Sequence, residues 1–393
     1  MGEGGEKRLK KIKAIIIDDS AFMRKVIGDL LAEDPDIEVI GKARNGREGV
    51  DLVQKLNPDV VTLDIEMPVL NGLQTLEIIM KDHPLPVVML SSLTQQGANE
   101  TIRALEMGAV DFIAKPSGSI SLDLYKVGSQ IIEKVKAAAQ VNLPGLKRVE
   151  PSPAKRTGLS RQAIESTAPA ASLPNRSLQA KPFGSKDANY TVKGNPTETN
   201  KISNFVAVGT STGGPKALQT FLRGLPESFN GALAIVQHMP PGFTRSLAQR
   251  LDSLCDIRVV EAEHNQVIEK GFAYIAPGNY HMEIKQKPGG ELYVSLNQND
   301  PRGGHRPSVD TLFESVAMIQ HPAKHAVIMT GMGNDGTAGL KRLKQTGLRT
   351  AIAEDESTCV VFGMPRAAIQ SGMVDITVPL YEIADQLLRS LNR

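Results

Sequence analysis

Short apolar runs alternate with amphipathic stretches over two separate parts of this 393-residue chain. In the first part the runs are IKAIII, IEVIG, DVVTLD, PVVMLS and VDFIA, and each is rich in Val or Ile and of strand length. Strands that are buried on both faces have this composition, and strands that alternate with helices lie parallel to one another. The pattern therefore predicts two α/β domains, each built on a doubly wound, mostly parallel sheet.

The chain divides into three segments of different character. Residues 11–138 carry five β/α units, which predict a flavodoxin-like domain. Residues 139–201 are rich in Pro, Ser and Thr without sustained periodicity, as expected of a flexible linker. Residues 202–393 resume the alternation, and the strand-rich stretch 257–300 predicts an antiparallel edge on the second sheet.

Helical periodicity separates the strands in both domains. In the first domain the predicted helices are Ser20–Ala32, Gly46–Leu56, Leu73–Met80, Glu100–Met107 and Ser121–Ala138. In the second domain we expect helices after Gly214, Gly242, Ser308, Gly333 and Pro379.

Composition excludes several classes of function. The net charge is +2 and neither domain is strongly basic, which argues against nucleic-acid binding. Cys255 and Cys359 are too few for a disulfide framework and indicate a reducing compartment. The start, MGEGGEKRLKKIKAIIIDD, is typical of a first strand rather than a signal peptide, and no apolar run approaches the roughly 18 residues of a membrane helix. We expect a cytoplasmic protein that is not inserted in a membrane.

Acidic residues follow two strands of the first domain. Asp18 and Asp19 end its first strand and Asp64 ends its third, and these strands are neighbours in a flavodoxin-like sheet. Three converging carboxylates repel one another unless a divalent cation such as Mg²⁺ binds them. Lys115 after the fifth strand can pair with phosphoryl oxygens, and Ser91 after the fourth offers a hydroxyl. The set predicts a phospho-accepting switch that requires Mg²⁺.

This order of acid pair, acid, hydroxyl and Lys-Pro resembles a response-regulator receiver domain. The resemblance implies that Asp64 is the residue phosphorylated by a histidine kinase. It also implies that Asp18, Asp19, Asp64 and the backbone carbonyl of Glu66 bind Mg²⁺, that Ser91 and Phe112 form the switch pair, and that Lys115 contacts the phosphoryl group.

A second constellation lies in the C-terminal domain. Ser211 occupies a G-x-S-x-G sequence between a strand and a helix, His238 closes the next strand, and Asp335 follows the strand HAVIMT. These residue types suit a nucleophile, its base and the group that orients the base, with main-chain N–H groups for the oxyanion. The chain order Ser, His, Asp differs from that of α/β-hydrolases, so that fold is disfavoured. His281 and His305 are interpreted as structural or cleft-lining residues.

The sequences GTSTGGPKAL, QHMPPGFT, YIAPGNYHM, GGHRPSVD and TGMGNDG together resemble the catalytic domain of chemotaxis protein-glutamate methylesterases, the CheB family. The resemblance implies that Ser211 is the nucleophile, His238 the base and Asp335 the orienting acid, with an oxyanion hole formed by the backbone N–H groups of Thr212 and Met332. It implies removal of methyl esters from glutamate side chains of methyl-accepting chemoreceptors with release of methanol, and deamidation of receptor glutamines. By this resemblance the enzyme acts in the adaptation of chemotaxis-type signalling and is activated when a chemotaxis histidine kinase phosphorylates it. The resemblance also implies that ester hydrolysis needs no cofactor.

Two other classes of protein share part of this pattern. A transcriptional response regulator would need a DNA-binding domain, which the near-neutral second domain without a helix-turn-helix pattern does not offer. A catalytically silent, phosphorylation-dependent adaptor would not need an intact Ser–His–Asp set. The linker is longer than in typical members of the family, so the sequence leaves the packing of the two domains open.

Overall fold

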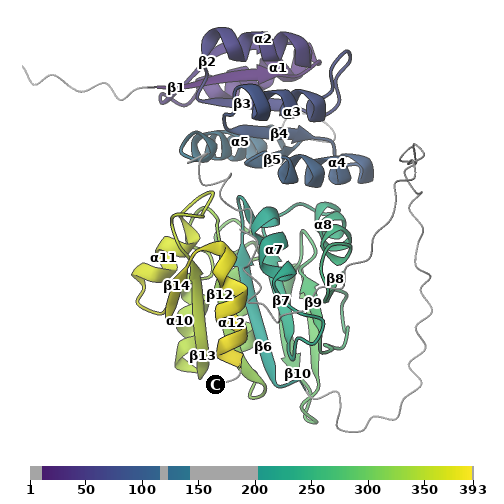
Figure 1. Cartoon of the computed structure of the whole chain (residues 1–393), viewed down its shortest axis with the longest axis vertical. Helices are drawn as coiled ribbons and strands as arrows, with labels where there is room; N and C mark the ends of the chain where they lie inside the picture. Colours follow the sequence, from purple (N-terminus) through teal and green to yellow (C-terminus); the bar gives the residue numbers. More distant parts are fainter. Residues whose placement is uncertain (1–10, 116–122, 142–201, 392–393) are drawn as a thin grey trace, which may run out of the picture. The chain divides into compact units, whose positions relative to one another are not determined.

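The computed structural model describes residues 11–115, 123–141 and 202–391, so most of the expected linker lies outside the described residues. The N-terminal domain is a parallel five-stranded sheet with the strand order β2-β1-β3-β4-β5 (Figure 1). Its strands are β1 (Ile12–Ile17), β2 (Ile37–Ala43), β3 (Val60–Asp64), β4 (Val87–Ser91) and β5 (Asp111–Ala114). The predicted neighbourhood of the first and third strands is confirmed.

Helices cover both faces of this sheet because successive side chains of a strand point to opposite sides. Ala14 and Ile16 of β1 pack in one core with α1 and α5, while Ile15 and Ile17 pack in another with α2, α3 and α4. The helices are α1 (Ala21–Ala32), α2 (Gly46–Leu56), α3 (Gly72–Asp82), α4 (Gln95–Glu106) and α5 (Asp123–Ala139).

Helix α4 begins at Gln95 rather than at the predicted Glu100. The Thr94 side chain accepts a hydrogen bond from Gly97 N at 3.0 Å and thereby caps the helix. The first turn, QQGA, offers little apolar periodicity, so the cap rather than the pattern determines where the helix starts.

The C-terminal domain contains a seven-stranded sheet with the order β14-β13-β12-β6-β7-β9-β8, and all its strand pairs are parallel. Its strands are β6 (Asn204–Thr210), β7 (Ala232–Gln237), β8 (Arg258–Glu261), β9 (Phe272–Ile275), β12 (Ala323–Ile328), β13 (Leu348–Glu354) and β14 (Ile376–Val378). Strand β6 lies between β7 and β12, where the strand order reverses, which is where open α/β sheets place their ligand sites.

The prediction of an antiparallel edge over 257–300 is wrong in its placement. Strands β8 and β9 join the sheet in parallel, and the antiparallel pair β10 (His281–Gln286) and β11 (Leu292–Asn297) forms a sheet of its own. Met282 and Ile284 of β10 are buried in the same core as Val309 of the following helix. The hairpin thus covers a face of the large sheet instead of extending its edge.

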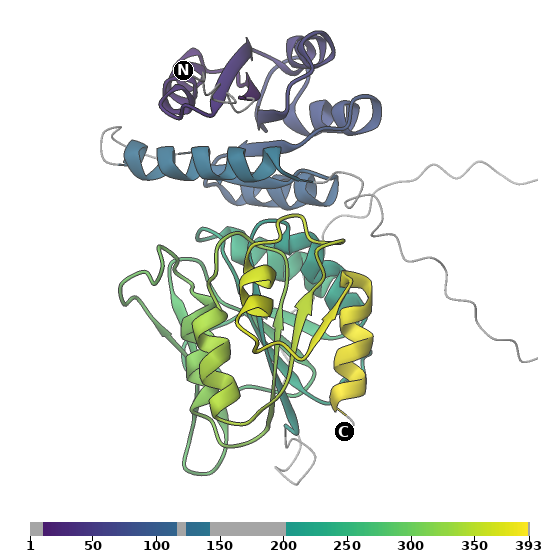
Figure 2. The same ribbon diagram turned by 90° about the vertical axis from the view of Figure 1, so that its left-hand side faces the viewer.

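Two layers of helices enclose the large sheet (Figures 1 and 2). One layer holds α7 (Gly214–Arg223), α8 (Phe243–Asp252) and α12 (Ile383–Leu391), which follows the short helix η1 (Leu380–Glu382); the other holds α9 (Val309–Ala317), α10 (Thr337–Gln345) and α11 (Met364–Gln370). The short helix α11 was not predicted, and the helix expected after Gly333 is α10, which begins at Thr337 with Gly336 as its N-cap. In the described ranges no helix is both long and apolar enough to cross a membrane.

Candidate active site and phospho-acceptor site

Lys115 joins two acidic residues at the carboxyl edge of the N-terminal sheet. Its Nζ lies 2.7 Å from Asp64 Oδ2 and 3.1 Å from Asp18 Oδ2. Both carboxylates are buried, at the ends of β3 and β1. Burial is the largest influence on the pKa of Asp64 and raises it to about 6, against the lowering effect of Lys115. The structure thus brings together three residues that the sequence places far apart.

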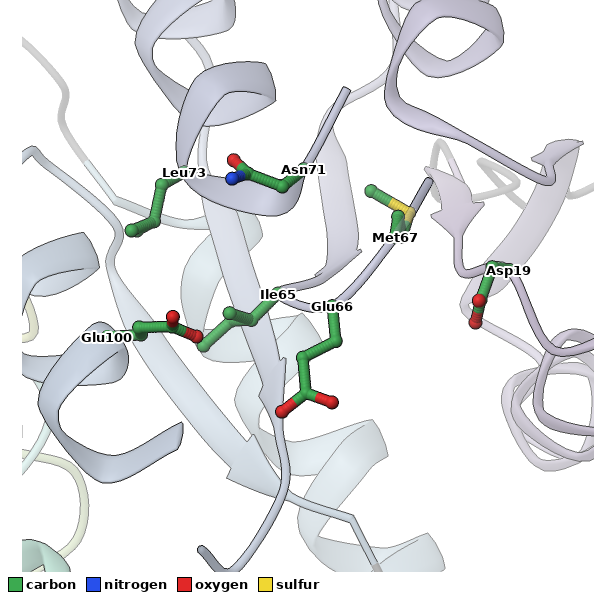
Figure 3. Close-up of a pocket in the computed structure, with 7 residues that line it drawn as sticks. All are labelled: Asp19, Ile65, Glu66, Met67, Asn71, Leu73 and Glu100. Carbon is green, nitrogen blue, oxygen red and sulfur yellow. The ribbon is translucent and has the colours of Figure 1, made fainter. Parts of the chain in front are cut away.

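The same edge fits a divalent cation. One carboxylate oxygen from each of Asp18, Asp19 and Asp64 lies within 4.8 Å of the others, and the single lysine leaves this cluster negatively charged. Figure 3 shows an adjoining pocket lined by three acidic side chains, Asp19 and Glu66 from the loops after β1 and β3 and Glu100 from α4. A hard cation with oxygen ligands, such as Mg²⁺, meets the demand of such a donor set.

Ser91, at the end of β4, is fully buried. Its hydroxyl donates to Gly97 O at 3.1 Å, in the first turn of α4, so it ties the strand to the helix. Phe112, in β5, is also buried, and Lys134 Nζ lies 5.2 Å from the centre of its ring. The two residues expected to form the switch pair therefore both contact helices of the domain.

Ser211, His238 and Asp335 meet at the carboxyl ends of the second sheet. His238 Nδ1 lies 3.2 Å from Ser211 Oγ, and His238 Nε2 lies 2.8 Å from Asp335 Oδ2. With Asp335 ionised, the proton of the neutral ring belongs on Nε2, which leaves the Nδ1 lone pair for the serine hydroxyl. The arrangement can remove the Ser211 proton when its oxygen attacks an electrophile.

Helix α9 holds Asp335 in place. The Asp335 carboxylate accepts hydrogen bonds from the N–H of Val309 at 2.7 Å, the N–H of Asp310 at 2.9 Å and the hydroxyl of Ser308 at 2.9 Å. Burial acts to raise the pKa of Asp335, but the hydrogen bonds from His238, Asp310 and Val309 outweigh it and lower the pKa to about 2. The positive end of the helix favours the same ionised state. This support was not predicted from the sequence, although Ser308 before an apolar run is a helix-cap signal.

His305 lies on the ring of His238. The two imidazole centres are 3.9 Å apart and their planes differ by 6°. Burial is the main cause that lowers the pKa of His305 to about 4, and His238 adds to the effect. His305 is therefore neutral near pH 7 and covers one face of the His238 ring. From the sequence His305 was expected only to be a structural or cleft-lining residue, because no spacing rule links it to position 238.

The turn around Ser211 is fixed by Gln237. Its Nε2 donates to Ser211 O at 2.9 Å, while its Oε1 accepts the hydroxyl of Thr210 at 2.6 Å. Across the described ranges, the backbone N–H groups of Thr212 and Met332 have no hydrogen-bond acceptor. Thr212 follows Ser211 directly, and Met332 follows Gly331, on which a Cβ would lie 2.8 Å from Ser211 Cβ. Two backbone donors therefore remain available beside Ser211.

Contacts connect the N-terminal domain to the turn that carries Ser211, and the described residues of both domains belong to one compact unit. The Thr212 hydroxyl donates to Asp111 Oδ2 at 2.6 Å. The Phe112 ring stacks on Phe243 of α8 with centres 4.6 Å apart. Asp111 and Phe112 belong to β5, the strand after which Lys115 reaches the acidic site. One short segment thus contacts both sites.

Known protein families match both domains of the chain. The family model of the CheB methylesterase matches residues 206–387, and that of the response regulator receiver domain matches residues 14–124. A protein-glutamate methylesterase/protein-glutamine glutaminase of Geobacillus kaustophilus is 51% identical over 97% of this chain and 99% of its own length. One with the same name from Oceanobacillus iheyensis is 45% identical over 98% of this chain and 100% of its own length.

Among solved structures, the CheB methylesterase catalytic domain of Thermotoga maritima is 44% identical; it covers 47% of this chain and 97% of its own, with a TM-score of 0.46. The sequence relationship extends over nearly the whole of the curated relatives and includes both predicted domains. The chain therefore belongs to the CheB methylesterase family, in the form that carries a response regulator receiver domain ahead of the methylesterase domain.

Proposed function

We propose that this protein is a phosphorylation-activated methylesterase that hydrolyses glutamyl methyl esters of chemoreceptors, and that it also deamidates receptor glutamines. The observation that carries the proposal is the hydrogen-bonded series Ser211–His238–Asp335 in a chain whose relatives are named for these two reactions. An ester and a primary amide share one acyl-transfer path and differ only in the leaving group. The substrate helices lie in the cytoplasm, so the proposal places this enzyme there as well.

In the proposed reaction, His238 Nδ1 takes the proton of Ser211 while Oγ forms a bond to the ester carbonyl carbon. The carbonyl oxygen becomes an oxyanion, which the N–H groups of Thr212 and Met332 stabilise. The tetrahedral intermediate then breaks its bond to the methoxy oxygen, which receives the proton from His238 and leaves as methanol. The product of this half is a glutamyl ester on Ser211.

Water completes the cycle by the same path. His238 accepts a proton from the water whose oxygen attacks the acyl carbon, and it returns that proton to Ser211 Oγ as the acyl bond breaks. The receptor keeps a glutamate side chain. With glutamine as substrate, ammonia takes the place of methanol. Asp335 keeps the ring orientation and stabilises its positive charge through both halves.

The receiver domain supplies the proposed control. The Asp64 carboxylate would accept a phosphoryl group from a chemotaxis histidine kinase, and Lys115 would pair with the new phosphoryl oxygens. Mg²⁺ bound to Asp18, Asp19, Asp64 and the Glu66 carbonyl would add positive charge at those oxygens. Mutual repulsion in the carboxylate cluster supports a cation at this place.

We infer that the unphosphorylated receiver holds the esterase in a low-activity state. Asp111 binds the side chain of Thr212, a proposed oxyanion-hole residue, and Phe112 stacks on Phe243. A phosphoryl group on Asp64 would bias Ser91 and Phe112 toward a second arrangement and weaken these contacts. Methanol release from methyl-labelled receptor membranes, with and without a small phosphodonor, tests both parts of the proposal.

A further inference from the structure

Glu354, the last residue of β13, is a carboxylate without exposed surface in the core of the methylesterase domain. Its Oε2 accepts the backbone N–H of Thr330 at 2.8 Å. Its Oε1 has no hydrogen-bond partner among the described residues. A buried carboxylate costs several kcal/mol of folding free energy unless it is well paired, so a residue kept in this state calls for a compensating role.

Thr330, the partner of Glu354, is connected to both sides of the active site. Its carbonyl accepts the N–H of Ser211 at 3.0 Å. Its hydroxyl donates to Thr212 O at 2.9 Å and accepts the N–H of Val361 at 3.0 Å. Because the N–H of Thr330 also donates to Glu354, every polar group of Thr330 is hydrogen-bonded. Two of these groups, the carbonyl and the hydroxyl, bind the turn that carries Ser211.

The segment after Thr330 leads directly to the second proposed oxyanion donor. Gly331 N donates to Val361 O at 3.0 Å, and Gly331 O accepts the N–H of Met364 at 2.8 Å. A Cβ on Gly331 would lie 2.8 Å from Ser211 Cβ, so the segment presses closely against the nucleophile. A displacement of Thr330 would therefore move Met332 relative to Thr212 and Ser211.

We propose that Glu354 is a positioning residue, which sets the spacing of the two oxyanion N–H groups by anchoring the Thr330 peptide from behind. This inference rests on the proposed esterase function. Glu354 has no path to the substrate, and its effect passes through Thr330. The Glu354 carboxyl group keeps an acceptor oxygen for the Thr330 N–H in either protonation state, which suits a group that must hold a peptide in one position. Since the oxyanion forms only during the reaction, a misplaced donor lowers kcat more than it changes KM.

The test compares Glu354→Met with Glu354→Gln in the full-length protein. Methionine fills similar volume but offers Thr330 no strong acceptor, whereas the glutamine amide oxygen can replace Oε2. Loss of one oxyanion donor costs about 100- to 1000-fold in kcat, so a displaced donor should cost at least about 10-fold. We expect this loss in methanol release by Glu354→Met with KM within about twofold, and a kcat within about threefold of wild type for Glu354→Gln.

Lys324→Met is the matched control for a lost buried charge. Lys324 is also buried, and its Nζ donates to Thr346 O at 2.7 Å and Ile319 O at 3.2 Å, at the opposite end of β12 from Thr330. We expect this variant to lower the melting temperature but to leave kcat unchanged. If Glu354→Met does not fold, Glu354→Asp takes its place, because the shorter acid withdraws its oxygens from Thr330 and should lower kcat in the same way.

The outcomes separate this inference from the proposed function. If wild type releases no methanol, the proposed function fails. If wild type is active, the inference is overturned by an undiminished kcat in Glu354→Met, or in Glu354→Asp where that variant replaces it. It is also overturned by an equal loss in Glu354→Gln, by a loss confined to KM, or by an equal loss of kcat in Lys324→Met.

Discussion

His238 and Asp335 are joined through Nε2 and Oδ2 at 2.8 Å, so that Nδ1, at 3.2 Å, is the nitrogen that contacts Ser211 Oγ. The carboxylate that orients the ring is itself bound by the first turn of α9. Because one carboxylate binds both the histidine and the helix end, the position of the His238 ring and the start of α9 depend on each other.

Asp335→Asn tests this double role. An asparagine keeps one acceptor oxygen, but its NH₂ group must face a donor, either His238 or the end of α9. We expect kcat to fall by about 100- to 10,000-fold while measurable hydrolysis remains, since the base is still present. Thermal unfolding should also begin at a lower temperature. Activity and melting temperature equal to those of wild type would contradict both roles.

The fold was predictable because its strands are continuous apolar runs. The strand order of the first sheet followed from the flavodoxin-like pattern, and the convergence of Asp18, Asp64 and Lys115 followed from that order. Helix α11 was not predicted because it is short and because the sequence of its first turn, which contains a proline, is typical of a loop. The hairpin of β10 and β11 was misplaced because pairing within a hairpin does not reveal whether it joins a larger sheet.

In the candidate active site, the residues that could be predicted from the sequence were those in a recognisable local motif. Ser211, His238 and Asp335 follow strands that end at one edge, so parallel pairing brings them together. His305 contacts this site directly, and Glu354 is connected to it through Thr330, in both cases by packing between segments distant in sequence. Neither carries a spacing signal, and a glutamate at a strand end is usually read as a solvated residue.

The stability of the methylesterase domain should depend on pH through Glu354. Burial is the main cause that raises its pKa in the folded protein from the ordinary 4.5 to about 7. Below pH 4.5 the group is protonated in both states; between 4.5 and 7 the unfolded chain alone loses the proton, so stability falls as pH rises. The loss amounts to about 3 kcal/mol.

Glu354→Gln does not titrate and should therefore gain stability relative to wild type between pH 4.5 and pH 8. Denaturant unfolding of both proteins at several pH values measures the difference. A difference in unfolding free energy that is constant across this range would show that Glu354 has the same pKa in both states.

Mg²⁺ should be needed for phosphorylation and not for hydrolysis. Chelation with EDTA should prevent activation by a small phosphodonor, since the carboxylate cluster then lacks its cation. The basal methanol release of the unphosphorylated protein should change by no more than about twofold. A catalytic zinc site that activates water uses about three protein ligands, and among the described residues no such ligand set lies beside Ser211. Basal activity that disappears with EDTA and returns with Mg²⁺ would contradict this assignment.

The contact between Glu106 and Arg250 offers a test of inhibition by the receiver. Arg250 donates to both oxygens of Glu106, at 2.7 and 3.0 Å, and joins α4 to α8. Arg250→Glu places two acids in contact and should raise the basal activity by about two- to fivefold, since such a surface pair is worth up to about 1 kcal/mol. The double variant Glu106→Arg, Arg250→Glu restores the pair and should return the activity to the basal level. An unchanged basal activity in Arg250→Glu would argue against inhibition through this contact.

The most direct measurement is methanol release from methyl-labelled receptor membranes by wild type, Ser211→Ala and Asp64→Asn, each with and without phosphodonor. Wild type should release methanol faster when phosphodonor is present, and Asp64→Asn should remain at the basal rate under both conditions. Ser211→Ala should lose at least about 1000-fold in both, with an unchanged melting temperature, because no other group can form the acyl intermediate. Near-normal release by a folded Ser211→Ala protein would contradict the account.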